Sequence, residues 1–137
     1  MVKIALDAAV KVTAGPTLQL GSKLEPDSYS VAQLSLEAKD NAENKDEFEL
    51  ALLPEASSVV LLGVRARNAE DGEPAIVTMT PKNATSTGGP VTVDGALIVA
   101  SRDVLMAIVA DGGPRTLVLA NPGAKPILVD VVAALDA

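Results

Sequence analysis

The sequence predicts an all-β fold, an antiparallel β-sandwich that is jelly-roll-like and carries an extended N-terminal arm. Its apolar residues recur with period two or in short runs, which turn clusters interrupt about every 8 to 14 residues. We expect about nine or ten strands and no long helix from this spacing. Hydrophobic residues make up 48% of the 137 positions, yet Tyr29 and Phe48 are the only aromatic ones. Such an aliphatic core favours a thin interior between two sheets over a pocket lined by rings.

The first part of the chain is predicted to form the arm. Residues 2–12 alternate as a strand that a Gly-Pro pair ends, although the alanines inside it also permit a helix. Residues 17–20 alternate again, and Gly21 is expected to end this second stretch. We therefore assign residues 1–26 to the N-terminal arm and residues 27–137 to the β-sandwich domain.

The next predicted strand, residues 28–38, carries an irregular pattern. Its apolar residues occupy odd positions up to Val31 and even positions from Leu34 onward. A regular strand keeps one parity on each face, so this change predicts a β-bulge or a bend near Ala32-Gln33.

An acidic stretch follows, with six acidic residues and two lysines between positions 37 and 49. Carboxylate oxygens are ligands for calcium, but the spacing lacks the alternate acids, glycine and closing glutamate of an EF-hand. We interpret the stretch as a solvated loop and expect no metal site and no cofactor. The acidic residues are Glu37, Asp40, Glu43, Asp46, Glu47 and Glu49.

The middle of the chain predicts further strands over residues 47–52, 57–67, 74–80 and 90–100. In the last of these, Asp94-Gly95 either joins two short strands or bends one. Residues 101–110 are ambiguous. Ser101 could cap a helical turn, but the β-branched residues that follow favour a strand, which is the interpretation adopted here.

The C-terminal segment contains two apolar runs on either side of the sequence ANPGAKP. We predict strand–turn–strand. Pro122 and Gly123 suit the central positions of a turn, because proline presets φ and glycine permits a positive φ. Asn121 is expected to support the turn by bonding nearby backbone amides.

Composition excludes much catalytic chemistry. The chain has no Cys and no His, so disulfides, thiolate sites and most catalytic triads are excluded. Its net charge of −7 disfavours binding to nucleic-acid phosphates. No continuous apolar run is long enough for a signal peptide or a membrane span. We therefore expect a soluble protein that is not an enzyme, has no catalytic residues and does not act on membranes.

The candidate functional residues are those suited to contacts between chains. Arginine makes planar, bidentate contacts with carboxylates, so the arginines are candidates for an interface. Residues 1–20 are also expected to contribute contacts between chains. The predicted interface residues are Val2, Ile4, Leu6, Arg65, Arg67, Arg102 and Arg115.

Three phrases of the sequence, taken in order, carry a family resemblance. They are DSYSVAQLSL, FELALLPEASSVVLLGVRAR and PVTVDGALIVASRDVLMAIVADGGPRTLVLANPGAKPILVDVVAALDA. Over roughly residues 27–136 the chain resembles small β-sandwich virion structural proteins of tailed bacteriophages. The first 25 residues have no counterpart in this pattern, and the loop from Ala69 to Pro90 lacks the aromatic residues expected of it.

The resemblance implies a non-enzymatic capsid decoration or cement protein, made in the host cytoplasm and located in the virion. Such a protein would form a homo-oligomer, a dimer or trimer, and bind the major capsid protein of the head lattice. Two alternatives remain at this point. One is a structural protein of the tail or neck, and the other is a carbohydrate- or receptor-binding β-sandwich module.

Overall fold

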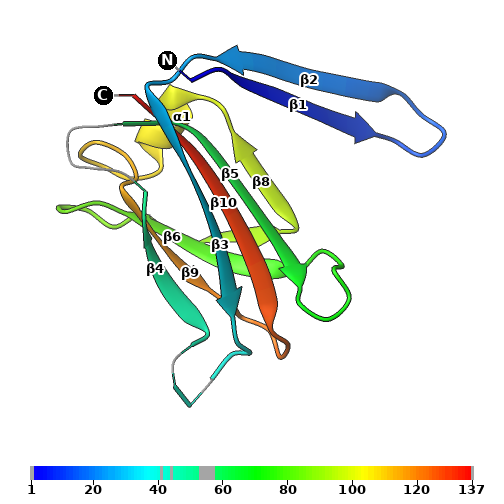
Figure 1. The fold of residues 1–137 in the computed structure, drawn as a ribbon, viewed down its shortest axis with the longest axis vertical. Coiled ribbons are helices and arrows are strands. Elements are labelled where there is room, and N and C mark those ends of the chain that lie inside the picture. The colour runs from blue at the N-terminus through cyan, green and yellow to red at the C-terminus, as the bar shows by residue number, and fades with distance from the viewer. Residues whose placement is uncertain (1, 41, 44, 53–57, 137) are drawn as a thin grey trace.

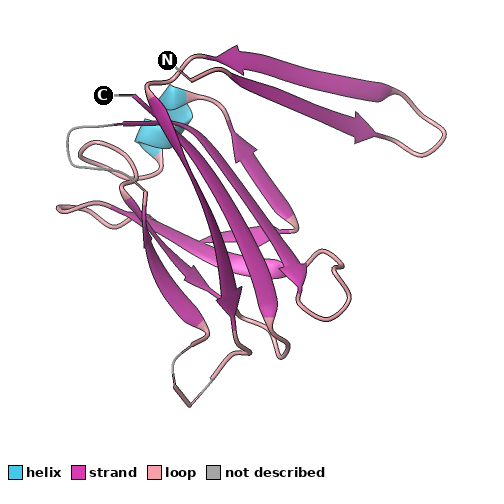
Figure 2. Ribbon diagram, viewed as in Figure 1, coloured by secondary structure: helices cyan, strands magenta, loops and turns pink. Residues whose placement is uncertain are grey.

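The computed structural model describes residues 2–40, 42–43, 45–52 and 58–136, and within them the chain forms ten strands and one short helix (Figures 1 and 2). The elements in chain order are β1 (Ile4–Lys11), β2 (Thr17–Leu24), β3 (Ser28–Leu36), β4 (Glu47–Ala51), β5 (Ser58–Asn68), β6 (Ile76–Lys82), β7 (Val91–Asp94), β8 (Ala96–Val99), α1 (Arg102–Ala107), β9 (Thr116–Ala120) and β10 (Ile127–Asp136). The predicted all-β class is confirmed.

Eight of the strands form two four-stranded antiparallel sheets that pack together as a sandwich. One sheet has the order β3-β10-β5-β8 and the other β4-β9-β6-β7. The pairs are nested along the chain, because β6 pairs with β7, β5 with β8, β4 with β9 and β3 with β10. As a consequence, every connection from β3 to β10 passes from one sheet to the other except the one between β6 and β7.

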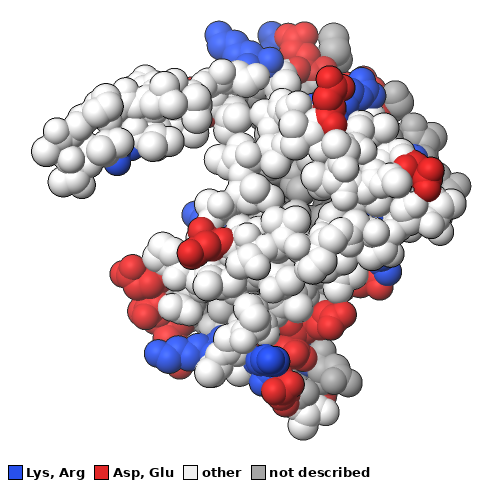
Figure 3. All heavy atoms as spheres, turned by 180° about the vertical axis from the view of Figure 1, so that it is seen from behind, with Lys and Arg blue, Asp and Glu red and all other residues white. Residues whose placement is uncertain are grey.

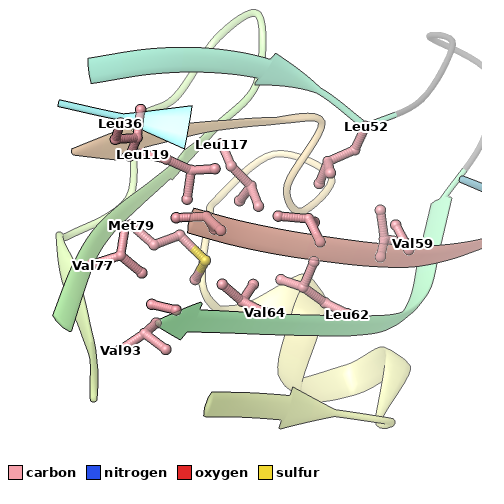
Figure 4. Packing of buried hydrophobic residues seen from close by; sticks show 14 of the residues in the cluster. Leu36, Leu52, Val59, Leu62, Val64, Val77, Met79, Val93, Leu117 and Leu119 are labelled. Carbon is pink, nitrogen blue, oxygen red and sulfur yellow. The ribbon is translucent and has the colours of Figure 1, made fainter. Parts of the chain in front are cut away.

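The core lies between the two sheets and is aliphatic, as the composition predicts. Period-two alternation turns the side chains of Leu62, Val129 and Leu119 inward, and each is completely buried. Figure 4 shows side chains of both sheets pointing toward one another, with Met79 among them. Both aromatic residues are exposed instead. Leucine, valine and methionine therefore fill the sandwich without a ring.

The N-terminal arm is a β-hairpin that forms a separate two-stranded sheet and projects from the sandwich (Figure 1). Its strands pair over their full length, from Ile4 opposite Leu24 to Lys11 opposite Thr17. The predicted first strand is confirmed, and its helical alternative is wrong. The predicted stop at Gly21 is also wrong. This glycine lies opposite Asp7 inside the paired strands. The strand continues through it, because glycine keeps both of its backbone hydrogen-bonding groups.

Strand β3 is regular, so the predicted bulge or bend is wrong. Its register with β10 runs without a shift from Ser28 to Leu36. The change of parity has another cause. Tyr29 and Val31 lie on the outer face and are exposed, while the small residues Ser30 and Ala32 occupy the inward positions. The odd or even positions of apolar residues therefore show which face of a strand is buried only where those residues point into the core.

The segment predicted as a strand after β8 begins instead with the helix α1. The Ser101 hydroxyl caps the helix by accepting a hydrogen bond from the Val104 backbone N–H at 3.3 Å. Leu105 is the one helical residue that is buried. The strand prediction failed because the Ser101 cap and the burial of Leu105 in the core are enough for a short helix between β8 and β9.

Two of the predicted turns join strands of different sheets and so are not hairpins. Asp94-Gly95 connects β7 to β8, and Gly95 has a φ of +83°, which glycine adopts without strain. Residues 121–126 connect β9 to β10 in the same manner. Strand–turn–strand is therefore right for the C-terminal segment. The positive φ predicted for Gly123 is wrong, because this connection spreads its change of direction over residues 121–126, whereas the one between β7 and β8 turns at Gly95 alone.

Asn121 ties this last connection to the rest of the sandwich. Its side chain is buried, and its Oδ1 accepts the Gly123 N–H at 2.9 Å, which confirms the predicted support of the turn. Its Nδ2 donates to the carbonyl of Glu37 at 2.9 Å and to that of Lys125 at 2.7 Å. One side chain thus fastens the β9–β10 connection to the end of β3.

We predict that Asn121→Ala lowers the free energy of unfolding by about 2–3 kcal/mol, because it leaves buried backbone groups without partners. Urea denaturation followed by circular dichroism measures the change. Lys125→Ala is the control, since it truncates an exposed side chain of the same connection and keeps the backbone carbonyl. Equal stability of the two variants would contradict the assigned role.

Candidate interaction surface

The arm is amphipathic, with all of its charges on one face. Directly paired residues of a hairpin share a face, so the pairs Ala8–Leu20 and Val10–Leu18 extend one apolar surface along it. The opposite face carries Lys11, Asp7 and Lys23. We call the first surface the apolar arm face, and its residues are Ile4, Leu6, Ala8, Val10, Leu18, Leu20 and Leu24.

The base of the apolar arm face packs against the sandwich. Ile4, Leu6 and Leu24 contact a small cluster of buried residues at the start of β5 and the end of β10. That cluster consists of Val60, Leu61 and Ala134. Of the predicted interface residues, Ile4 and Leu6 are therefore engaged within their own chain, and the Val2 N–H donates to the Pro26 carbonyl at 3.2 Å.

The far end of the same face lies open to solvent, and so does Val12, which follows β1 at the hairpin turn. Val10, Val12, Leu18 and Leu20 are between 48% and 58% exposed, and we call these four residues the arm tip. Figure 3 shows the arm reaching past the sandwich, with a hollow between it and the body and few charges on its visible surface. Exposed apolar side chains that gather in this way mark a site of interaction. These four residues lie within the predicted contact region 1–20, but the individually predicted residues Val2, Ile4 and Leu6 lie nearer the N-terminus, because an alternating pattern does not show which part of a face is covered.

A second apolar surface lies on the outer face of the sheet β3-β10-β5-β8. Val31, Val132, Gly63 and Ile98 are aligned across the four strands by their registers. Val31 is 59% exposed and Ile98 49% exposed, and a Cβ added at Gly63 would meet open space. We call these four residues the outer apolar row. It lies directly beside the row that contains Leu61 and Ala134, which the base of the arm covers.

Of the predicted arginines, the structure brings only Arg65 and Arg67 together. The Arg65 Nη2 and Nε donate to Oδ2 of Asp130 at 2.6 and 3.0 Å, and the Arg67 Nε lies 3.8 Å from the same oxygen. Arg102 instead donates to the Ser58 hydroxyl oxygen from the start of α1. The fourth arginine, at position 115, is half-buried just before β9, so the four do not form one patch. Their role at an interface stays a prediction.

A hollow also lies at the end of the sandwich near the β9–β10 connection. It has a volume of about 520 Å³ and is lined mainly by apolar atoms, among them those of Ile76 and Pro122, with Asn121 and Lys125 at its side. In the described ranges, no three acidic side chains gather closely enough to hold a metal ion. The hollow therefore has the shape of a binding site but no evident set of reactive side chains.

Among the residues whose structure is described, no helix has the length and apolar character needed to cross a membrane.

Fold and surface together define a β-sandwich with an apolar hairpin arm. A scan against models of protein families finds no family that matches the chain, and a search of curated proteins finds no relative. What the protein does must therefore be inferred from its own residues.

We predict that Asp130→Asn lowers the free energy of unfolding by about 1 kcal/mol, because it removes the carboxylate that holds Arg65. The loss should shrink in high salt, which already screens this half-exposed pair. Denaturation in low and high salt measures both effects. Asp94→Asn is the control, since its exposed carboxylate forms no ion pair within the described residues. Equal losses in both variants would show that the ion pair is without effect.

A second prediction concerns the contact between the arm and the sandwich. Leu61→Ala should weaken the seat of the arm, so that trypsin cleaves faster after Lys11 and Lys23 under native conditions. The neighbouring Leu62→Ala is the control, because Leu62 points into the core. It should lower global stability by about 2–5 kcal/mol without a selective gain in cleavage of the arm. Equal cleavage of the arm in both variants would contradict the proposed seat.

Proposed function

We propose that this protein is a non-enzymatic structural subunit that self-associates and binds a larger protein lattice. The observation that carries the proposal is the arm, which holds a charge-free apolar surface away from the body of a chain with net charge −7. An apolar surface of this kind is retained on a protein when another surface covers it. Self-association or lattice binding supplies such a surface.

The strand order supports a jelly-roll architecture within this proposal. A jelly roll has eight strands in two sheets, and nested pairing of its strands arises when one long antiparallel hairpin is wound into a sandwich. The pairing of β3 with β10 through to β6 with β7 follows this pattern. Capsid and lectin domains use this architecture, so it is compatible with a role in an assembly without specifying one.

The resemblance over residues 27–136 supports the particular setting, a decoration or cement protein on the head of a tailed bacteriophage, with the major capsid protein as its partner. In such an array, many copies of one weak contact act together, and avidity replaces a large individual interface. A location in the tail or neck would use the same surfaces.

The other classes have less support. A carbohydrate-binding module favours an aromatic platform in a concave site, whereas the two exposed aromatic residues, Tyr29 in β3 and Phe48 in β4, belong to different sheets. Enzymatic activity would have to proceed without histidine or cysteine. A structural role requires neither feature.

The proposal predicts that the full chain co-sediments with tailed-phage heads purified without it, and that its binding saturates. Saturation is expected because a lattice presents a fixed number of equivalent sites. Centrifugation with increasing amounts of protein measures this, and ribosomes serve as the control particle because they are large and carry no such lattice. A monomer that pellets with neither particle would overturn the proposed function.

A further inference from the structure

We infer that the arm tip of one copy packs against the outer apolar row of a second copy, and that two copies exchange arms in this way around a twofold axis. The inference deepens the proposed function and rests on it for self-association. It commits to a second copy of this chain as the partner of the arm.

The contact that the arm makes within its own chain supports this assignment. The base of the apolar arm face already covers Val60, Leu61 and Ala134 on the outer side of the sheet β3-β10-β5-β8. The outer apolar row continues the same surface by one step along the strands. A second arm would therefore extend an existing arm–sheet contact with side chains of the same kind.

Within one chain, the arm tip and the outer apolar row do not cover each other. The arm tip projects past the sandwich (Figures 1 and 3), and its four residues stay about half exposed. Val31 and Ile98 of the outer apolar row are equally exposed. Because Gly63 leaves open space at the centre of the row, a flat hairpin face can approach the sheet closely there.

Charge favours a second copy over an unrelated apolar partner. The side chains of residues 1–24 include three lysines and one aspartate, a net charge of +2. Residues 25–137 carry 17 acidic and 8 basic side chains, a net charge of −9. The arm is thus attracted at long range to the body of another copy, although two whole chains repel and the charges beside the outer apolar row, those of Arg65, Arg67 and Asp130, nearly balance. All of the charges in β1 and β2 lie on the polar face of the hairpin, so the apolar contact buries none of them.

Reciprocal exchange of the arms also enlarges the interface. A single hairpin tip is small against the roughly 1,200 Å² that a stable interface buries. A twofold axis makes the same contact twice, because the arm of each copy meets the sheet of the other. Exchange therefore closes the assembly at two chains and covers both exposed surfaces of each.

Sedimentation velocity of the full chain over a range of concentrations tests the inference. Leu20→Asp and Val31→Asp should each raise the dimer dissociation constant at least about tenfold, since each places a charge in an apolar contact. Gln19→Asp and Thr92→Asp are the matched controls. They add the same charge on the opposite face of the arm and on the other sheet, and they should leave the constant unchanged.

Cross-linking tests the geometry independently, because the natural chain has no cysteine. A Leu20→Cys variant is mixed with a Val31→Cys variant that carries a mass tag, and a short bismaleimide is added. The mixed product should exceed that from Gln19→Cys with the tagged Val31→Cys by about tenfold, since the first pair shares a contact and the second does not. Both variants of a pair remain folded, because all three side chains are exposed.

The outcomes separate the two proposals. If the chain dimerises but the Asp variants behave like their controls, or if both cysteine pairs cross-link equally, arm exchange is wrong and the structural function stands. If the chain is monomeric at all concentrations but binds heads, arm exchange is again wrong. If the chain is monomeric at all concentrations and does not bind heads, both proposals are wrong.

Discussion

The last strand holds the sandwich together. Strand β10 lies between β3 and β5 and is paired with both along almost its full length. Its inward residues Ile127, Val129, Val131 and Ala133 are buried against the opposite sheet. The sheet β3-β10-β5-β8 is therefore incomplete until β10 is in place. Its strand pairs join residues that are far apart in the chain. Such long-range pairing is typical of slow-folding β proteins.

The aliphatic core and the buried asparagine follow from this arrangement. Two sheets that meet through Leu, Val and Met leave a thin interior with no room for an unpartnered polar group. Among the described residues, Asn121 is the one polar side chain that is buried, and it lies at the end of the sandwich where the connections pass. There it pairs with backbone groups that sheet pairing cannot satisfy.

The arm obeys a different constraint. Its two strands satisfy each other's backbone groups but cannot bury an apolar face, since a single hairpin has only one layer. The sandwich covers the base of that face and leaves the tip open. An open apolar surface on a chain of net charge −7 is compatible with solubility, because the lysines and the aspartate of the arm face the solvent on its other side. The same design makes the arm available to a partner.

By itself the sequence determined the class of the fold, the aliphatic core and the first strand of the arm. Each of these depends on local alternation or on composition, which neighbours in the chain decide. The sequence was misleading at β3, where Val31 is exposed although it alternates with its neighbours as a core residue would. It was also misleading at α1, where the β-branched residues favoured a strand but a capped helix forms. Only the tertiary structure decided that β9 and β10 belong to different sheets and that Ile4 is covered while Leu18 is open. These outcomes depend on which surfaces meet in space, and periodicity within a segment carries no information about its distant partners.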